Sequence, residues 1–336
     1  MNILALSDLY IPSEVMRQAL AALNPAKVSV VEWPNRSITE LHHRIREIER
    51  LGPEAVAPPD GMRPYLADAE LIVTHMCPVN AAMIADAPKL RWIGVCRSAC
   101  ENVDVPSANA RGIRVLDVPA RNAVAVAEYT IGLIIAERRN IARAHHALFS
   151  GRWEKIFPNE GHPTELRGKT VGIIGFGAIG KEVARRLNPF EVRILAHDPL
   201  QSSDVFAAHE VEPVLLATLL RESDVVTLHA RRGAADPPLI GSAELGLMKP
   251  GAYLVNTARA SLVDVNALAA ALRERRLAGA AIDVFLHEPL ESDSPLRKLD
   301  NLTLTPHLAG STVEAFHGAP RLLVERIKRQ LEANGV

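Results

Sequence analysis

Three glycines in the segment TVGIIGFGAIGKEVARRL have the spacing of a turn that binds the phosphates of a dinucleotide. Gly175, Gly177 and Gly180 follow an apolar run and open a helical pattern. The first glycine permits a tight turn, the second lets the backbone approach a pyrophosphate, and the third allows the helix to pack closely on the strand. Ala178 and Ile179 complete the turn, and the helix N-terminus would face the phosphates.

An acidic residue after the next apolar run supports this interpretation. The expected strand Val192–Ala196 ends just before Asp198, about 20 residues past the glycines, where a carboxylate would hydrogen-bond a ribose diol. A carboxylate there repels a 2′-phosphate, so the pattern predicts NAD rather than NADP. Arg231 and Arg232 could put positive charge near the adenosine, or they could be two solvated loop arginines. The alternative for the whole segment is a glycine-rich turn that binds no nucleotide.

The elements that must position these residues are short apolar runs alternating with helical patterns, as in a parallel α/β protein. The expected strands of the first series are Asn2–Leu6, Val28–Val31, Leu71–Thr74, Trp92–Val95 and Ile113–Leu116. Those of the second series are Thr170–Ile174, Val192–Ala196, Val225–Leu228, Tyr253–Val255, Ala280–Ile282 and Leu302–Leu304, the number of strands in a complete dinucleotide fold. We therefore predict the α/β class, with two Rossmann-like, doubly wound parallel-sheet domains separated by a cleft.

Two long helical patterns indicate how the chain divides. One extends from an N-cap at Asn122 to Phe149 and would connect the domains. The other, Val313–Glu332, is amphipathic and is expected to return to the first domain. We expect a discontinuous substrate (catalytic) domain of residues 1–117 plus 311–336, and an NAD-binding domain of residues 118–310.

Composition excludes several classes of protein. The 336 residues are 48% hydrophobic and 23% charged, a balance typical of folded globular domains. With 38 basic against 39 acidic residues, no overall charge favours nucleic acid or a membrane surface, and we expect neither as a partner. No apolar run is long enough to span a membrane and no basic segment precedes the apolar start, so we expect a cytoplasmic protein. Cys77, Cys96 and Cys100 lack the spacing of a zinc site or a disulfide framework, and no metal is expected.

Six motifs follow one another along the chain: VAEYTIGL, GKTVGIIGFGAIG, AHDP, MKPGAYLVNTARASLVD, GAAIDVFLHEPL and NLTLTPHLAGST. In this order and spacing they resemble the D-isomer-specific 2-hydroxyacid dehydrogenase family, which includes phosphoglycerate, glycerate and D-lactate dehydrogenases. The resemblance spans nearly the whole chain. It implies an NAD-dependent oxidoreductase that moves a hydride between the nicotinamide and C2 of a small 2-hydroxy or 2-keto acid.

The resemblance also implies three catalytic residues. The family's substrate arginine falls on Arg259 in NTARA, its acidic partner on Glu288 in HEP, and its proton-transfer histidine on His307 in TPH. An imidazole can exchange the hydroxyl proton near neutral pH, a carboxylate would hold it in one tautomer, and a guanidinium suits a substrate carboxylate. Taken singly, these could instead be a surface arginine, a turn cap and a loop histidine. All three follow expected strands of one sheet, at the edge where ligands bind.

Further positions implied by the resemblance concern the cofactor. Thr257, Ala258 and Asp283 match positions near the nicotinamide, and Ala230 matches one on the adenosine side. Asp283 could accept a hydrogen bond from the carboxamide or cap the turn after its strand.

The family's glycine-rich substrate loop is replaced here by Arg97, Ser98 and Ala99. In the family, backbone N–H groups of this loop bind the substrate carboxylate, and alanine has less backbone freedom than glycine. Arg97 adds a positive charge, and we hypothesise that the substrate has a second anionic or strongly polar group. The alternative is an arginine that points into solvent or pairs with Glu101.

These observations predict an enzyme whose partner is a small-molecule 2-hydroxy or 2-keto acid. The alternative is an NAD(H)-sensing interaction protein or corepressor-like homologue without metabolic activity, which intact catalytic residues do not exclude. Because the family commonly forms homodimers, we expect a homodimer whose interface includes Asn122–Phe149 and the arm around Trp153. The sequence ends at Val336, so we expect no regulatory extension of the kind that some phosphoglycerate dehydrogenases have.

Overall fold

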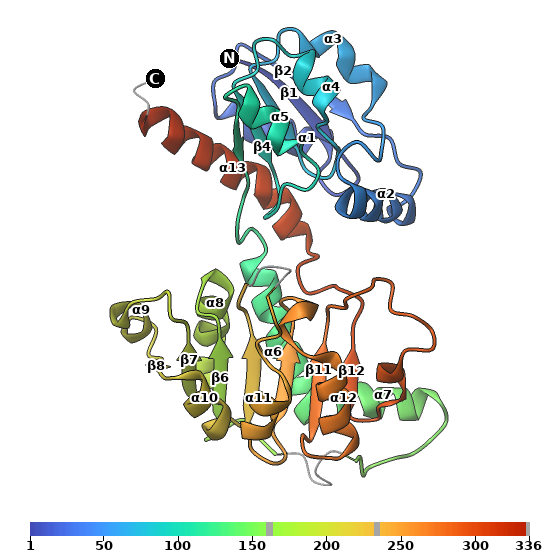
Figure 1. Ribbon diagram of the computed structural model, residues 1–336, viewed down its shortest axis with the longest axis vertical. Coiled ribbons are helices and arrows are strands. Elements are labelled where there is room, and N and C mark those ends of the chain that lie inside the picture. Colours follow the sequence, from blue (N-terminus) through green and yellow to red (C-terminus); the bar gives the residue numbers. More distant parts are fainter. Residues whose placement is uncertain (159–163, 232–235, 334–336) are drawn as a thin grey trace. The chain divides into compact units, whose positions relative to one another are not determined.

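Two parallel β-sheets organise the chain in the computed structural model, which describes residues 1–158, 164–231 and 236–333 (Figure 1). Unit 1 comprises Met1–Asn122 and Thr312–Val336, and unit 2 comprises Ala123–Ser311. All described strand pairs within the two sheets are parallel, so the predicted α/β class with two parallel-sheet domains is confirmed. In the described ranges, no helix combines the length and apolarity needed to cross a bilayer.

Unit 1 has a five-stranded sheet of order β2-β1-β3-β4-β5. Its strands are β1 (Asn2–Ser7), β2 (Lys27–Glu32), β3 (Leu71–Thr74), β4 (Trp92–Val95) and β5 (Arg114–Leu116). Its helices are α1 (Ser13–Ala21), α2 (Ile38–Leu51), α3 (Arg63–Leu66), α4 (Ala81–Ala85), α5 (Val105–Ala110) and α13 (Val313–Ala333). The strand order reverses between β1 and β3, and ligands of open parallel sheets bind at the carboxyl edge beside such a reversal.

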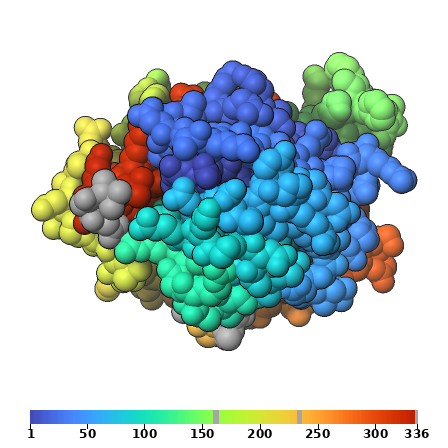
Figure 2. Space-filling model, turned by 90° about the horizontal axis from the view of Figure 1, so that it is seen from above, coloured from blue at the N-terminus to red at the C-terminus, as the bar shows by residue number. Residues whose placement is uncertain are grey.

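The C-terminal helix α13 completes the hydrophobic core of unit 1. Its residues Leu323 and Ile327 are fully buried and pack in one cluster with Ile3 of β1 and Leu71 of β3. Gly94 of β4 makes room for the helix, because a Cβ there would lie 2.6 Å from Cδ2 of Leu323. In Figure 2 the red residues of α13 abut the blue residues at the start of the chain. The first and last described elements of the chain therefore share one core.

Unit 2 has a seven-stranded sheet of order β12-β11-β10-β9-β6-β7-β8. Its strands are β6 (Thr170–Ile174), β7 (Arg193–His197), β8 (Glu212–Pro213), β9 (Val225–Leu228), β10 (Tyr253–Asn256), β11 (Gly279–Ile282) and β12 (Leu302–Leu304). Its helices are α6 (Ala123–Arg138), α7 (Ile141–Phe149), α8 (Ala178–Leu187), α9 (Ser203–Ala207), α10 (Leu216–Glu222), α11 (Ser242–Leu247) and α12 (Val265–Arg273). All six expected strands are present. The additional strand β8 is exposed and only two residues long, too short to give a hydrophobic pattern.

The helical pattern from Asn122 to Phe149, expected as one helix, forms two, α6 and α7. Asn140 separates them and adopts a left-handed backbone with a φ of 55°, which asparagine tolerates better than most residues. Its side-chain oxygen accepts a hydrogen bond from Nη1 of Arg143 at 3.3 Å. The apolar pattern continues across the break, so hydrophobic spacing alone predicted a continuous helix.

Candidate active site

The glycine turn lies where the second sheet reverses its order, between β6 and β9. Gly175 follows β6 and has a φ of 91°, and a Cβ there would lie 2.4 Å from the backbone nitrogen of Ala230, which follows β9. In the first turn of α8, a Cβ on Gly180 would lie 2.3 Å from the carbonyl oxygen of Gly175. Close backbone contacts therefore require glycine at both positions.

Gly177 faces open space at the N-terminus of α8. A Cβ built there would have no atom of the described residues within 4 Å. No side chain caps the helix, whose first residues are Ala178 and Ile179. Backbone N–H groups at such a helix start lack intrahelical acceptors and favour an anion. The residues present therefore fit the pyrophosphate of a dinucleotide.

Asp198 is held against the glycine turn. It follows β7, and its Oδ2 accepts a hydrogen bond from the Phe176 N–H at 2.8 Å while Oδ1 accepts one from Leu200 at 3.0 Å. These bonds place the carboxylate at the sheet edge where the ribose of a dinucleotide bound to the turn would lie. Of the two arginines that could favour a 2′-phosphate, Arg231 is exposed and Arg232 lies outside the described residues.

The histidine and glutamate expected to act together are directly hydrogen-bonded. Nδ1 of His307 lies 2.9 Å from Oε2 and 3.1 Å from Oε1 of Glu288, and Oε1 also accepts from the Phe285 N–H at 3.0 Å. His307 has a φ of 55°, and such backbone strain is commonly found at functional sites. About half of the imidazole, 52%, is exposed. Because Nδ1 is bonded to Glu288, Nε2 is the ring atom left for proton exchange.

The surroundings of His307 favour its charged form. The hydrogen bond that Nδ1 donates to Glu288 raises the pKa of His307 above its usual value; burial lowers this pKa, and the charges of Glu288 and Asp283 raise it further. The positive charge of Arg259 acts in the opposite direction, so Arg259 is close enough to influence the imidazole.

Asp283 organises the loop that contains His307. This fully buried residue follows β11 and accepts hydrogen bonds from Oγ1 of Thr305 at 2.6 Å, the Leu308 N–H at 2.9 Å and the Ala309 N–H at 2.8 Å. These donors all belong to the loop after β12, not to the turn that follows the strand of Asp283 itself. Its carboxylate joins the ends of β11 and β12.

Arg259 and the two residues before it leave β10 together. Thr257 shares a hydrogen bond with Thr130 of α6 at 2.9 Å, and the Ala258 N–H donates to Oδ1 of Asn256 at 3.0 Å. The Arg259 side chain is exposed, and its Nη1 donates to the carbonyl oxygen of Ala258 at 2.7 Å. The three expected catalytic residues therefore follow β10, β11 and β12, at the carboxyl edge of one sheet.

The expected substrate loop follows β4 in unit 1. The Val118 N–H donates to the carbonyl oxygen of Arg97 at 2.8 Å, and Oγ of Ser98 donates to the carbonyl oxygen of Val118 at 3.4 Å. Ala99 is not among the residues with a positive φ, so this loop does not need the backbone freedom of glycine at that position.

The Arg97 guanidinium is paired with carboxylates. Nη2 lies 2.8 Å from Oε1 of Glu49 and 3.7 Å from Oε2 of Glu101, and Nη1 lies 3.5 Å from Sδ of Met76. The expected alternative, pairing with Glu101, therefore occurs, although Glu49 is the nearer partner and was not anticipated.

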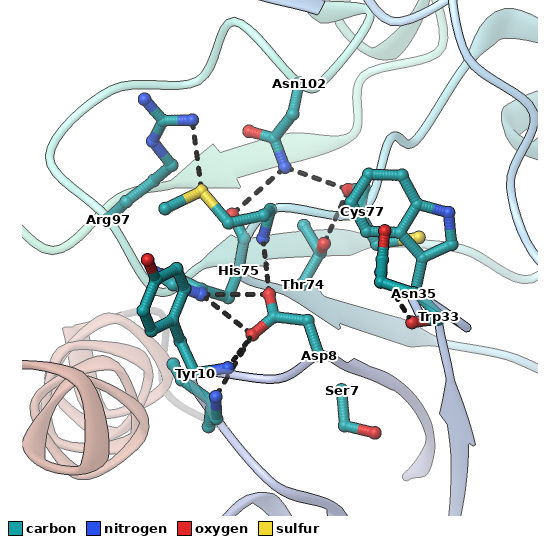
Figure 3. A network of polar contacts seen from close by, with 12 residues as sticks. Ser7, Asp8, Tyr10, Trp33, Asn35, Thr74, His75, Cys77, Arg97 and Asn102 are labelled. Carbon is teal, nitrogen blue, oxygen red and sulfur yellow. Dashed lines mark hydrogen bonds and ion pairs between the residues drawn. The ribbon is translucent and has the colours of Figure 1, made fainter. Parts of the chain in front are cut away.

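A buried Asp–His pair that sequence reasoning missed lies at the reversal of the first sheet. Asp8 follows β1 and His75 follows β3, and Oδ2 of Asp8 lies 2.9 Å from Nδ1 of His75 with both side chains fully buried (Figure 3). The backbone N–H groups of Tyr10, Ile11 and Met76 also donate to Asp8. Burial raises the pKa of Asp8, but the charge of His75 and these hydrogen bonds lower it below its usual value. Burial lowers the pKa of His75, while Asp8 acts in the opposite direction.

The cysteines are not arranged for chemistry. Cys77 and Cys96 are buried, as expected of small apolar residues, and Cys100 is half-buried against the core of unit 1. Burial raises the pKa of Cys100 to about 11, so its thiol is protonated at neutral pH. Among the residues that the structure describes, no group of three or more His, Cys, Asp and Glu side chains could hold a metal ion.

Comparison with known proteins gives consistent matches. A family model described as "D-isomer specific 2-hydroxyacid dehydrogenase, NAD binding domain" matches residues 131–309. The glyoxylate reductase of Thermofilum pendens is 41% identical over 239 residues, which are 70% of this chain and 70% of that protein. The D-3-phosphoglycerate dehydrogenase of Archaeoglobus fulgidus is 38% identical over 257 residues, which are 76% of this chain. The chain spans about half of that longer relative, 48%.

A solved structure matches along both units. It is an acyclic imino acid reductase in complex with NADPH and D-Arg, 26% identical, with a TM-score of 0.72 and coverage of 99% of this chain and 98% of that one. Because this neighbour binds NADPH, the carboxylate beside the glycine turn is the feature to test for the choice of dinucleotide.

Asp198→Asn is expected to weaken NADH binding roughly tenfold or more, because a hydrogen bond to a charged group contributes about 1.5 to 3 kcal/mol. Wild-type protein should bind NADH more tightly than NADPH, and the substitution should narrow that preference. Titration followed by nicotinamide fluorescence measures both affinities.

Asp204→Asn, an exposed aspartate in the first turn of α9, is the matched control and should change neither affinity. A wild-type preference for NADPH, or an unchanged preference in Asp198→Asn, would contradict the role given to Asp198.

Proposed function

Because this chain belongs to the D-isomer specific 2-hydroxyacid dehydrogenase family, we propose that it oxidises a small 2-hydroxy acid to the 2-keto acid with NAD, and catalyses the reverse reduction. The observation that carries this proposal is the hydrogen bond between His307 and Glu288, at the same sheet edge as Arg259. Oxidation of a 2-hydroxy acid requires a base for the hydroxyl proton while hydride leaves C2, and an imidazole is suited to that task.

In the proposed mechanism each side chain has one task. Nε2 of His307 accepts the C2 hydroxyl proton as the C2–H bond breaks and the C2=O bond forms. NAD, when bound, supplies the hydride acceptor. Glu288, bonded to Nδ1, stabilises the imidazolium that results. Arg259 donates to the substrate carboxylate and to the oxygen on which carbonyl charge develops, for which a planar guanidinium is well suited.

We assign the remaining contacts by unit. Unit 2 is the NAD-binding domain, with the glycine turn at the pyrophosphate, Asp198 at the ribose and Ala230 on the adenosine side. Thr257, Ala258 and Asp283 would lie near the nicotinamide. Unit 1 is the substrate domain, and the backbone N–H groups of Ser98 and Ala99 add donors for the substrate carboxylate. Arg97 belongs to the same substrate loop, and its positive charge is paired with Glu49 and Glu101.

His307→Ala is expected to lower kcat by about 100- to 10,000-fold, because general acid–base catalysis contributes that much. Wild-type protein should oxidise NADH with at least one of glyoxylate, hydroxypyruvate and pyruvate, measured by the loss of nicotinamide absorbance. NADH binding should persist in the variant.

His287→Ala removes an exposed histidine from the loop after β11 and should leave kcat unchanged. Wild-type protein that binds NADH but reduces no 2-keto acid would instead favour the NAD(H)-sensing interaction protein.

Glu288→Gln should shift the pH dependence of the reaction toward acid. Reduction needs protonated His307 and falls as pH rises through its pKa, whereas oxidation needs the neutral imidazole and rises there. The hydrogen bond that His307 donates to the Glu288 carboxylate raises that pKa, so removal of the carboxylate should bring the pKa toward about 6.5 or below. Profiles of kcat/KM against pH measure the shift in both directions.

At neutral pH the Glu288→Gln variant should therefore lose more reduction than oxidation. Superimposable wild-type and variant profiles would show that Glu288 does not set the protonation of His307.

We further propose that the protein forms a homodimer through α7 and the segment that follows it. Three large apolar side chains stand exposed there: Phe149 at 86%, Trp153 at 79% and Ile156 at 78%. Ile141 and Leu148 of α7 are exposed as well. Exposed aromatic residues gathered in one segment are typical of a protein–protein interface, and a second copy of this chain is the expected partner.

The double substitution Phe149→Ser and Trp153→Ser should convert the dimer to a monomer, since an aromatic hot spot worth about 2 kcal/mol raises Kd roughly 30-fold. Light scattering coupled to size-exclusion chromatography gives the mass. Leu215→Ser, which removes another exposed apolar residue of unit 2, should remain dimeric. A dimeric double variant would place the interface elsewhere.

A further inference from the structure

The Arg121 guanidinium, in the segment after β5, packs on an aromatic ring. Its Cζ lies 5.0 Å from the centroid of the Phe316 ring, and its Nη1 donates to the carbonyl oxygen of Ala315 at 3.1 Å. Tyr10 stacks on the same ring with centroids 4.2 Å apart. The ring and the carbonyl orient the guanidinium, but they use few of its five N–H donors.

No carboxylate balances the charge of Arg121 in the part of the chain that the structure describes. Arg97, by contrast, pairs with Glu49 and Glu101. The charge of Asp8 reaches Arg121, but the oxygens of Asp8 already accept from His75 and from backbone N–H groups. Burial and the charge of Arg97 lower the pKa of Arg121 to about 10. At neutral pH it is therefore a half-buried cation for which the described residues provide no counter-ion.

Arg121 lies near residues at the carboxyl edge of the first sheet. Arg97 follows β4, and Asp8 and His75 follow β1 and β3 at the point where the order of the first sheet reverses (Figure 3). The charges of both arginines act on His75, so the two guanidinium groups lie around the buried pair. Ligands of open parallel sheets bind beside such a reversal, and a half-buried guanidinium whose charge is not balanced there favours an anion.

The backbone before Arg121 supports a specific role. Ala120 has a φ of 63°, a conformation that a residue with a Cβ rarely adopts. Strain of this kind persists where the surrounding structure enforces it, and it is concentrated at functional sites. Here the strained residue, Ala120, directly precedes Arg121 and so sets the direction in which the chain enters it.

We propose that Arg121 binds a second anionic group of the substrate, a carboxylate, sulfonate or phosphate remote from the C1 carboxylate, so that the enzyme prefers dianionic 2-hydroxy and 2-keto acids. This inference rests on the proposed function, in which other donors bind the C1 carboxylate. The positive charge of Arg97 was the sequence-based candidate for this task. Because Glu49 and Glu101 neutralise the charge of Arg97, Arg121 is the better candidate to bind this anionic group.

Binding of unreactive 2-hydroxy acids to the protein saturated with NADH tests the proposal without turnover. D-lactate has one anionic group, whereas D-malate and D-3-phosphoglycerate add a carboxylate and a phosphate. Arg121→Gln should weaken D-malate or D-3-phosphoglycerate binding roughly tenfold or more, the loss of a charge-assisted hydrogen bond, and leave D-lactate almost unchanged. Isothermal titration calorimetry measures each Kd, and which dianion is affected distinguishes carboxylate from phosphate.

Arg114→Gln is the matched control. The Arg114 guanidinium also packs on an aromatic ring, 5.1 Å from the centroid of Trp92, but Arg114 begins β5 and so lies at the opposite edge of the sheet. This variant should bind all three acids as wild-type protein does. Arg121→Lys keeps the charge and should retain most of the preference for dianions, and rising salt should weaken dianion binding more steeply than D-lactate binding in wild-type protein.

Equal losses for D-lactate and the dianions in Arg121→Gln, or no loss for any of them, would overturn the proposal. If Arg121→Gln fails to fold, the Arg121→Lys variant and the salt series test the proposal instead. A wild-type protein that binds dianions no more tightly than D-lactate would refute it. If the protein reduces monoanionic keto acids but shows no preference for dianions, the proposal for Arg121 fails and the proposed function still stands. Absence of any 2-keto acid reduction would defeat the proposed function itself.

Discussion

All strands of a parallel sheet end at the same edge, and this constraint determines where the chemistry of the chain can lie. In unit 2 it brings the glycine turn after β6, Arg259 after β10 and His307 after β12 to one edge, although these residues are far apart in the sequence. In unit 1 the same constraint brings Asp8, His75, Arg97 and Arg121 to the carboxyl edge of the first sheet. Both sheets reverse their strand order once: the glycine turn lies beside the reversal in unit 2, and Asp8 and His75 lie beside it in unit 1.

A buried aspartate organises the edge in both units. Asp283 accepts hydrogen bonds from a threonine hydroxyl and two backbone N–H groups of the loop with His307. Asp8 accepts from three backbone N–H groups and holds His75. Because a buried carboxylate must be fully hydrogen-bonded, each aspartate dictates the path of the loops around it. In unit 2 the half-exposed imidazole of His307 thus stands on a loop that a buried carboxylate holds.

Local patterns predicted most of the fold and part of the site. The spacing of Gly175, Gly177 and Gly180 is a local requirement of one turn, so sequence alone identified it, and every expected strand is present. The break at Asn140 was missed because a single left-handed residue does not interrupt the apolar pattern. The pairing of Asp8 with His75 could not be predicted, since it depends on β1 and β3 being neighbours. The free charge of Arg121 and the neutralised charge of Arg97 depend on which carboxylates the fold brings near, which spacing does not reveal.

The interleaved order of the two units has a consequence for synthesis on the ribosome. Unit 2 is continuous, so it can bury its core as soon as its last residue, Ser311, has left the exit tunnel. Unit 1 has to wait, because Leu323 and Ile327 of α13 fill the space beside β1 and β3. Until α13 has been made, the nascent first sheet exposes that apolar face, and the later-made unit 2 can fold before the earlier-made one.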